Sequence, residues 1–503
     1  MSEDLDAMFE QMKEPSKTKA EGKTSAKKRG RPKSSASSPV ETKKTAKTKK
    51  AKVSAVETPQ KDKKVLEFID TRNLTKQGKA SVIEQWEASN RGNTRNSLMN
   101  SLMQSAQEKF GAGKVFGTRT ALDQLVIGIP IPALPFEYIL ANDVFPLQIV
   151  MMLAGSWGSC KSALSYEIFR WFYENSGITV HIDAEDKFDA DFACQIMRVA
   201  NDVIPIISNQ ATSLEESQKL ITYYIDAIKK MLIGNKENPG PGARVPCCLC
   251  LDSVAGNTSE TTQKKILDEG FAGKSYAVEA LSLAKFLPTI KSTFTNFPFT
   301  LLLINHAKEK NDEMGNKHVY TLGGGALNFH ESFEIHNSVW KSGYNNTQFE
   351  GVGITLKCVK NSFGPTGRRA RTRFIWWQEE DPETGNVIEH KLWDWNWAIC
   401  DLFVNTTNLN KKRLKDRDLI LNVKAPTADI ECMANMPALG MGKNEYLTFQ
   451  EVGQMIHENE EISNRIRDAL GIKRRYVLDG SKTYEDIVNE HVTEDDDGQG
   501  EST

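Results

Sequence analysis

The chain has 503 residues, of which 39% are hydrophobic and 26% are charged, and its formal net charge at pH 7 is −2. This composition excludes a wholly disordered protein and allows two or three domains with at least one large core. No run approaches the roughly 20 apolar residues that span a bilayer, and the opening Ser2-Glu3-Asp4 does not resemble a secretory signal. We therefore expect a cytoplasmic protein without a membrane partner.

Residues 1–64 are expected to form a disordered basic arm. The segment 17–64 carries 17 Lys or Arg and four Asp or Glu, a net charge of +13, and has no aromatic residue. Such a segment cannot bury enough apolar surface to offset its chain entropy. Its AT-hook-like part fits the minor groove of A·T-rich DNA; unspecific attraction to phosphates and a nuclear-import signal are the alternative interpretations. The residues of this AT-hook-like part are Arg29, Gly30, Arg31 and Pro32.

The middle of the chain predicts a helical segment followed by an α/β core. Residues 65–129 have apolar side chains at helical intervals, which indicates a helical lead-in segment that contributes to oligomerisation. Residues 130–400 alternate short β-branched runs with longer amphipathic stretches, which is typical of a mainly parallel central sheet. The predicted strands are Ile149–Ala154, Ile178–Ile182, Cys247–Leu251, Thr300–Ile304 and Val352–Val359.

The remaining chain is expected to contain a smaller C-terminal α/β domain and an acidic tail. In residues 401–484, the spacing of Thr448 and Glu451 predicts a helix whose first turn is closed by a capping box. Residues 485–503 hold eight acidic residues and no Lys or Arg. This tail either keeps the protein soluble or, being opposite in charge to the arm, modulates the access of duplex DNA.

The eight cysteines lack paired CxxC spacing, so they predict neither a disulfide framework nor a zinc site. Cys247, Cys248 and Cys250 fall in an apolar run and are expected to be small core residues.

The first chemical motif is a loop between the strand Ile149–Ala154 and an amphipathic stretch at 163–173. In this context backbone N–H groups and a helix N-terminus can hold phosphates. Lys161 would neutralise the phosphates and Ser162 would ligate Mg²⁺. The consensus has glycine where this chain has Cys160. The predicted ATP-binding residues of the loop are Gly155, Ser156, Trp157, Gly158, Ser159, Cys160, Lys161 and Ser162.

Two further strands end in carboxylates. Glu185 follows Ile178–Ile182 and would act as the general base that activates water. Asp252 follows Cys247–Leu251 and would hold the water shell of Mg²⁺. Asp and Ser are also ordinary turn residues at strand ends, but three such strand ends in order favour a nucleotide site.

Taken together, the motifs resemble the RecA and UvsX recombinase family, the second of which is found in large bacterial viruses. Ile182-Asp183-Ala184-Glu185 is similar to the family's catalytic-glutamate strand, and Leu251-Asp252-Ser253-Val254-Ala255 to its second nucleotide motif. In this resemblance Lys161 and Glu185 are catalytic, and Asp189 is the adenine-side aspartate.

Leu303-Ile304-Asn305-His306 resembles the strand whose last residue couples ATP to DNA. RecA proteins usually have Gln at that place, and His306 is the UvsX-like choice. Lys360 matches a residue that reaches the neighbouring subunit's ATP, although the second lysine of that segment is Ser362 here.

The resemblance also implies a mobile DNA-binding loop at 307–322 with a glycine-rich end, for which an ordinary polar surface loop is the alternative. A first DNA loop is expected within 257–274. Glycines allow a close approach to a nucleic-acid strand, and lysines contact phosphates. The predicted DNA-binding residues here are Lys308, Lys310, Lys317, Gly323, Gly324 and Gly325.

The fold implied by the resemblance is a RecA-like P-loop ATPase core. The implied activity is an ATP- and Mg²⁺-dependent recombinase that forms homo-oligomeric helical filaments on single-stranded DNA and exchanges strands with duplex DNA. A single-strand binding protein and a mediator are the implied partners. The alternatives are a hexameric RecA-like motor and a DNA-coating protein that binds nucleotide without hydrolysing it.

Overall fold

The structure is a computed structural model. It describes residues 126–487 except 200–205, 236–239, 270–275, 295, 312–316, 322–324, 346–348, 381, 383–384, 425–431 and 485, and also residues 102, 105 and 109. The expected basic arm, most of the helical lead-in segment and nearly all of the acidic tail therefore lie outside the described residues.

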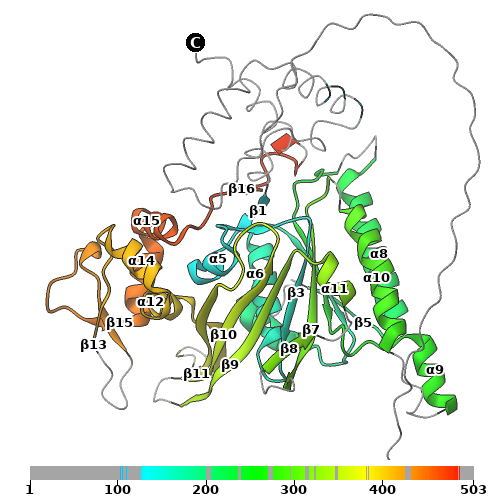
Figure 1. The fold of residues 1–503 in the computed structure, drawn as a ribbon, viewed down its shortest axis with the longest axis horizontal. Coiled ribbons are helices and arrows are strands. Elements are labelled where there is room, and N and C mark those ends of the chain that lie inside the picture. Colours follow the sequence, from blue (N-terminus) through cyan, green and yellow to red (C-terminus); the bar gives the residue numbers. More distant parts are fainter. Residues whose placement is uncertain are drawn as a thin grey trace, which may run out of the picture. The chain divides into compact units, whose positions relative to one another are not determined.

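A ten-stranded sheet dominates the described part of the chain (Figure 1). Its strand order is β12-β11-β10-β9-β3-β7-β6-β4-β5, and β8 pairs with β7. The six strands from β9 to β5 run parallel, whereas β10, β11 and β12 continue the sheet antiparallel. The strands are β3 (Ile149–Gly155), β4 (Ile178–Asp183), β5 (Ile207–Gln210), β6 (Cys247–Asp252), β7 (Phe299–Asn311), β8 (Lys317–Thr321), β9 (Phe333–Asn345), β10 (Glu350–Asn361), β11 (Arg369–Glu380) and β12 (Val387–Trp393). The predicted mixed α/β fold with a mainly parallel sheet is confirmed.

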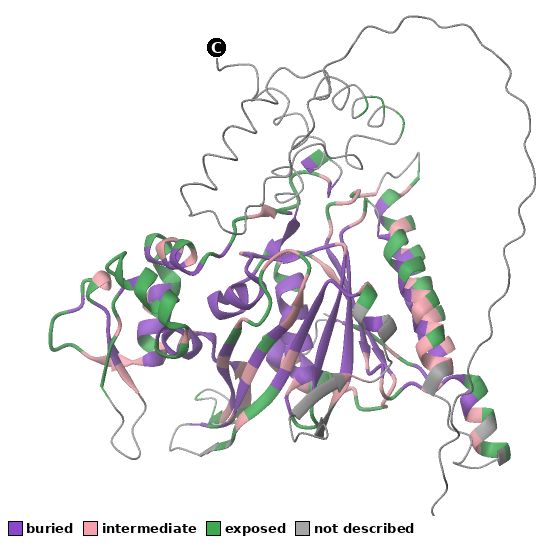
Figure 2. Cartoon of the chain, viewed as in Figure 1, coloured by how far each residue is buried: buried purple, intermediate pink, exposed green. Residues whose placement is uncertain are grey.

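Both faces of the central strands are buried because helices cover each side (Figure 2). Met151 and Leu153 of β3 belong to the core that includes α6 (Lys161–Glu174) and α7 (Ala190–Met197). Val150 and Met152 alternate with them and belong to the second core, which includes the neighbouring helices α8 (Leu214–Ile233) and α10 (Tyr276–Thr293). The buried cysteines at 247, 248 and 250 are divided between these two cores, as small apolar residues can be.

All five predicted strands are present, but β7 and β10 extend further than predicted. The expected loop at 307–322 is partly a β-hairpin, because Ala307 pairs with Thr321 and Asn311 with Lys317. The expected first DNA loop at 257–274 includes a helix, α9 (Glu260–Glu269). Within the expected helical lead-in, residues 127–129 belong to the strand β1 (Ile127–Pro130), since this segment pairs with β2 (Val144–Pro146) and β16 (Tyr476–Val477).

Apolar side chains of the C-terminal residues belong to the same hydrophobic core as β3 and α6. The expected boundary between residues 400 and 401 falls inside α12 (Trp395–Asn405), which packs against both β11 and α14 (Phe449–Glu458). The predicted capping box is confirmed, since the Thr448 side chain and the Glu451 side chain each accept from the other's backbone N–H. The other elements are α5 (Leu134–Leu140), α11 (Gly325–His330), α13 (Asn408–Lys415), β13 (Asn422–Lys424), β14 (Met433–Asn435), the 3₁₀ turn Pro437–Leu439, β15 (Leu447–Thr448) and α15 (Glu460–Leu470).

Among the residues that the structure describes, no helix combines the length and the apolar character that crossing a bilayer requires.

Candidate functional site

The predicted nucleotide residues converge because their strands are parallel neighbours. The carboxyl ends of β3, β6 and β4 lie at one edge of the sheet with His306 of β7, where Gly155 is level with His306 and Asp183 with Asp252. Chain segments far apart in the sequence are thereby brought to one place, as is usual for ligand sites in open α/β sheets.

The phosphate loop leaves β3 and enters α6. Gly155 has no room for a side chain, because a Cβ there would lie 2.4 Å from the carbonyl oxygen of Asn337 on β9. The Asn337 amide also donates to the carbonyl of Ser159, at 3.2 Å. The Lys161 ammonium turns back onto the carbonyl oxygen of Ser156, at 2.9 Å. The loop thus has the compact form and the helix N-terminus that an anion site requires.

Cys160 is the residue of this loop that departs from the consensus. Its backbone has φ 56° and ψ 34°, which is the left-handed region, and it is the residue immediately before α6. A glycine is favoured at such a place because a Cβ makes this conformation costly. Burial raises the pKa of the Cys160 thiol to about 12, although Lys161 acts in the opposite direction. The thiol is therefore not a nucleophile at neutral pH.

Ser162 and Asp252 form the part of the site that fits a magnesium ion. The Ser162 hydroxyl donates to Oδ2 of Asp252 at 2.5 Å, and hydroxyl and carboxylate oxygens are the donors that Mg²⁺ prefers. Lys161 is buried beside them, and burial lowers its pKa while Asp252 and Glu185 raise it. One cation and two oxygen donors at a helix N-terminus fit a magnesium-bound phosphate group.

The carboxylate of Glu185 accepts hydrogen bonds from two side chains and contacts a third. Oε1 accepts from the Ser253 hydroxyl and lies 3.3 Å from Nε2 of His306, and Oε2 accepts from Lys187 at 2.7 Å. Burial raises the pKa of Glu185, but the hydrogen bonds from Lys187 and Ser253 and the contact with His306 outweigh it, so that the pKa falls to about 2. The carboxylate is therefore ionised throughout the neutral range and can accept a hydrogen bond from water.

The chain is similar in sequence to RecA proteins of several bacteria. No protein-family model matches the chain. The RecA protein of Bacteroides thetaiotaomicron is 24% identical over 289 residues, which cover 57% of this chain and 80% of that protein. The RecA protein of Chloroflexus aurantiacus is 22% identical over 340 residues, 67% of this chain and 90% of that protein. That of Ureaplasma parvum is 23% identical over 263 residues, 52% of this chain and 71% of that protein.

The chain is therefore similar to RecA proteins over more than half of its length, at 22–24% identity. The mixed α/β fold with its large, mainly parallel sheet is consistent with a RecA-like core.

Two predicted nucleotide residues of this RecA-like chain lie apart from the loop. Asp189 is exposed, and its side chain caps α7 by accepting from the backbone N–H of Phe192 at 3.0 Å. Lys360 on β10 pairs with Glu334, three residues before the Asn337 that is level with Gly155. Measured along the strands, at about 3.3 Å per residue, Lys360 therefore lies about 10 Å from the phosphate-loop edge, on the side of the opposite edge of the sheet.

The predicted DNA residues are only partly described. Lys308, Lys310 and Lys317 belong to the hairpin of β7 and β8, and Gly325 begins α11. Gly323 and Gly324 lie outside the described residues, as do Arg29, Gly30, Arg31 and Pro32.

Several residues that support Glu185 escaped the sequence analysis. Asp183 is buried and accepts backbone N–H groups of residues 185, 187 and 188, so it fixes the turn that carries Glu185. A Cβ at Gly256 would lie 2.8 Å from Cγ of Glu185, so glycine leaves room for that side chain. Ser253 and Lys187 donate to it, as described above. The signal available for Ser253 was its position directly after Asp252.

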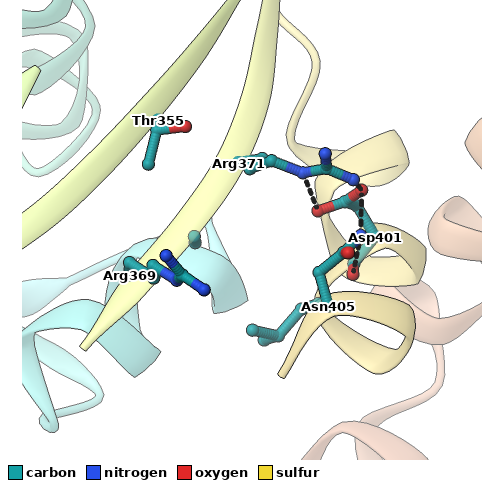
Figure 3. A pocket seen from close by; sticks show the side chains of 7 residues that line it. Thr355, Arg369, Arg371, Asp401 and Asn405 are labelled. Atoms are coloured by element: carbon teal, nitrogen blue, oxygen red, sulfur yellow. Dashed lines mark hydrogen bonds and ion pairs between the residues drawn. The ribbon is translucent and has the colours of Figure 1, made fainter. Parts of the chain in front are cut away.

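A cavity of about 200 Å³ lies away from this site, between β10, β11 and α12 (Figure 3). Arg371 donates two hydrogen bonds to Asp401, at 3.1 and 2.5 Å, and Asn405 adds a third at 2.9 Å. Arg369 on the same wall is exposed. Because β11 is separated from β3 by β10 and β9, we assign this cavity no part in nucleotide chemistry.

Proposed function

We propose that the chain is an ATP-dependent recombinase that forms filaments on single-stranded DNA and catalyses homologous pairing and strand exchange in recombination and repair. The observation that carries the proposal is the gathering of Lys161, the Ser162–Asp252 pair and the Glu185–His306 pair at one edge of the sheet. The similarity to RecA proteins over 52–67% of the chain supports it independently.

In this proposal each residue has one task in ATP hydrolysis. The loop from Gly155 and the N-terminus of α6 bind the phosphates, and Lys161 leaves the Ser156 carbonyl to neutralise them. Ser162 and Asp252 would hold Mg²⁺, which stabilises negative charge that develops on the phosphate oxygens. Glu185 orients the attacking water and accepts its proton.

His306 is proposed to transmit the state of the nucleotide to DNA. It contacts Glu185 with its side chain and lies on β7, the strand that continues into the β7–β8 hairpin with Lys308, Lys310 and Lys317. A shift of His306 that follows a change at Glu185 is therefore passed directly along one strand to a lysine-bearing hairpin. The UvsX-like assignment, and with it the cytoplasm of an infected bacterium, rests on the presence of His at this position.

The filament is proposed to complete the ATP site between subunits. Lys360 lies about 10 Å from its own chain's phosphate-loop edge, which supports a contact with the ATP of a neighbouring subunit. Single-stranded and duplex DNA are the proposed ligands, with the basic arm as an additional contact. A single-strand binding protein and a mediator are proposed as partners by family analogy alone.

The deciding experiment measures ATP hydrolysis with and without single-stranded DNA, beside electron microscopy with a slowly hydrolysed ATP analogue. DNA-stimulated turnover together with helical filaments is the expected result, and strand exchange is then assayed directly. Closed rings with unwinding activity would favour the hexameric motor. Filaments without any turnover would favour the DNA-coating protein.

A further inference from the structure

His181 is a buried polar side chain that the proposed mechanism does not use. It lies on β4, is 1% exposed, and neither of its ring nitrogens has a hydrogen-bond partner among the described residues. Leaving a buried nitrogen without a hydrogen bond destabilises the folded state. Phenylalanine would fill the same volume without that cost, so packing alone does not account for histidine.

Three aromatic side chains pack around His181. The ring centroids of Tyr166, Phe169 and Phe188 lie 5.7, 6.4 and 5.1 Å from that of His181. These contacts come from α6 and from the turn after β4, and they hold the imidazole in one place. The side chain therefore has little freedom to turn towards another partner.

Nε2 of His181 points at the acid of the proposed magnesium site. It lies 3.9 Å from Oδ2 of Asp252, and this is the same oxygen that accepts the Ser162 hydroxyl at 2.5 Å. β4 and β6 are adjacent parallel strands, with His181 level with Cys250 and Asp183 level with Asp252. If the Asp252 carboxylate moves by about 1 Å towards His181, Oδ2 of Asp252 and Nε2 of His181 reach the ordinary hydrogen-bond distance.

We propose that His181 is a positioning residue for Asp252, whose Nε2–H becomes the donor to that carboxylate when the Ser162 hydroxyl is engaged by a magnesium-bound nucleotide. The proton is assigned to Nε2 because Asp252 is the acceptor that faces it. In this arrangement one side chain always donates a hydrogen bond to Asp252. Ser162 is the donor before the magnesium-bound nucleotide binds, and His181 is the donor afterwards. This inference rests on the proposed function, since it requires that Ser162 and Asp252 hold Mg²⁺.

The test compares three variants of the full chain. H181F keeps an aromatic ring and removes the donor. H181Q places an amide N–H near the position of Nε2, whereas H181N places the same group near that of Nδ1, so these two share their chemistry and differ in where the donor lies. A fluorescent ATP analogue is titrated into each protein with Mg²⁺ and again with EDTA, and thermal unfolding is followed without nucleotide.

The ratio of the two affinities is the readout. Residues that orient a metal ligand typically change metal affinity by about 10–100-fold. We expect H181F and H181N to lower the magnesium-dependent gain in affinity by about tenfold, and H181Q to stay within about threefold of the wild type. Affinity in EDTA should be unchanged in all three, whereas a merely structural role would lower both affinities together.

The possible outcomes distinguish a failure of the role proposed for His181 from a failure of the proposed function. Should H181F show the wild-type ratio, or should H181N and H181Q behave alike, His181 does not position Asp252. If the wild-type protein binds no nucleotide, or gains nothing from Mg²⁺, the proposed function fails and the inference fails with it. If H181F does not fold, the comparison of H181Q with H181N still settles the question.

Discussion

At Cys160 a residue with a side chain holds a backbone conformation that favours glycine, with φ 56°. The left-handed conformation costs about 1–2 kcal/mol for an L-residue, whereas glycine loses about 0.4–1 kcal/mol through the greater freedom of its unfolded chain. We therefore expect C160G to raise the free energy of unfolding by about 0.5–1 kcal/mol. C160A, which removes only the thiol and keeps the strain, is the matched control and should give no gain in urea unfolding. Equal stability of C160G and C160A would show that the strain is absent.

Glu185 is the residue on which the chemistry of the proposed ATPase depends. Removal of a general base typically slows a reaction about 10²–10⁴-fold, so E185Q should lose turnover by at least about 100-fold while nucleotide binding and filaments persist. Asp186 is its exposed neighbour, and D186N is the matched control, which should stay within twofold of wild type in steady-state hydrolysis. Normal turnover by E185Q would refute the assignment of the base.

The pH dependence of Glu185 follows from its depressed pKa. Its folded pKa of about 2 lies below the ordinary value of 4.5, so the stabilisation that it contributes is fully present above pH 4.5 and is lost as the pH falls towards 2. Protonation of Glu185 therefore causes no loss of ATPase activity between pH 8 and about pH 5.

Among the elements, α5 and α15 are joined by a buried ion pair in addition to their apolar contacts. Arg467 donates to both oxygens of Glu137, at 2.7 and 2.8 Å, and the Glu137 side chain is 1% exposed. Burial raises the pKa of Glu137 to about 7, although Arg467 acts to lower it. Breaking a buried pair leaves one charge without compensation. R467A should therefore lower the free energy of unfolding by about 3–5 kcal/mol.

The loss of unfolding free energy in R467A should be larger at high pH than at low pH. Without Arg467, the folded pKa of Glu137 rises further above 4.5, so that the folded state keeps a proton that the unfolded state releases. Stability then falls as the pH rises from 4.5 through the folded pKa, and chemical unfolding should show a larger loss at pH 8 than at pH 5. R465A removes a half-exposed arginine from the same helix, which lies 3.9 Å from Glu461 and donates to the carbonyl of Arg417, and should cost less than about 1 kcal/mol. Equal losses in the two variants would contradict the prediction.

At the scale of the whole molecule, the C-terminal segment completes the sheet that begins at β1. Tyr476 and Val477 pair with Ile127 and Gly128 in parallel. The side chains of this segment that are buried are Ile472, Leu478, Tyr484 and Ile487. A chain of 1–471 loses all of these contacts, whereas a chain of 1–487 loses only residues 488–503, which belong to the acidic tail.

Burial of one large apolar side chain contributes about 1.5–3 kcal/mol, so the four lost in 1–471 approach the stability of a whole domain, about 5–15 kcal/mol. We expect 1–471 to lose cooperative thermal unfolding in circular dichroism and 1–487 to keep the wild-type midpoint within a few degrees. A cooperative transition of 1–471 at the wild-type temperature would show that the segment is only peripheral.

The central strands and the phosphate loop could be predicted from the sequence because their signals are local. An apolar run followed by Gly155, Lys161 and Ser162 describes a strand, a loop and a helix without knowledge of any partner. The capping box of Thr448 and Glu451 is local in the same sense, since its two partners are three residues apart. The β9, β11 and β12 strands were missed because they carry polar and aromatic residues on a partly exposed face, where periodicity is weak.

The order of the motifs, the charges of the two ends of the chain and the types of residue at the strand ends can be read from the sequence. Which of these residues meet depends on how the strands are arranged in the fold. The Ser162–Asp252 hydrogen bond joins residues 90 positions apart, and the contact between Glu185 and His306 joins residues 121 apart. Such contacts depend on the order and register of parallel strands, which no local pattern specifies. For the same reason His181 was overlooked: its polar nitrogen becomes notable only when β4 and β6 lie side by side and Asp252 comes to face it.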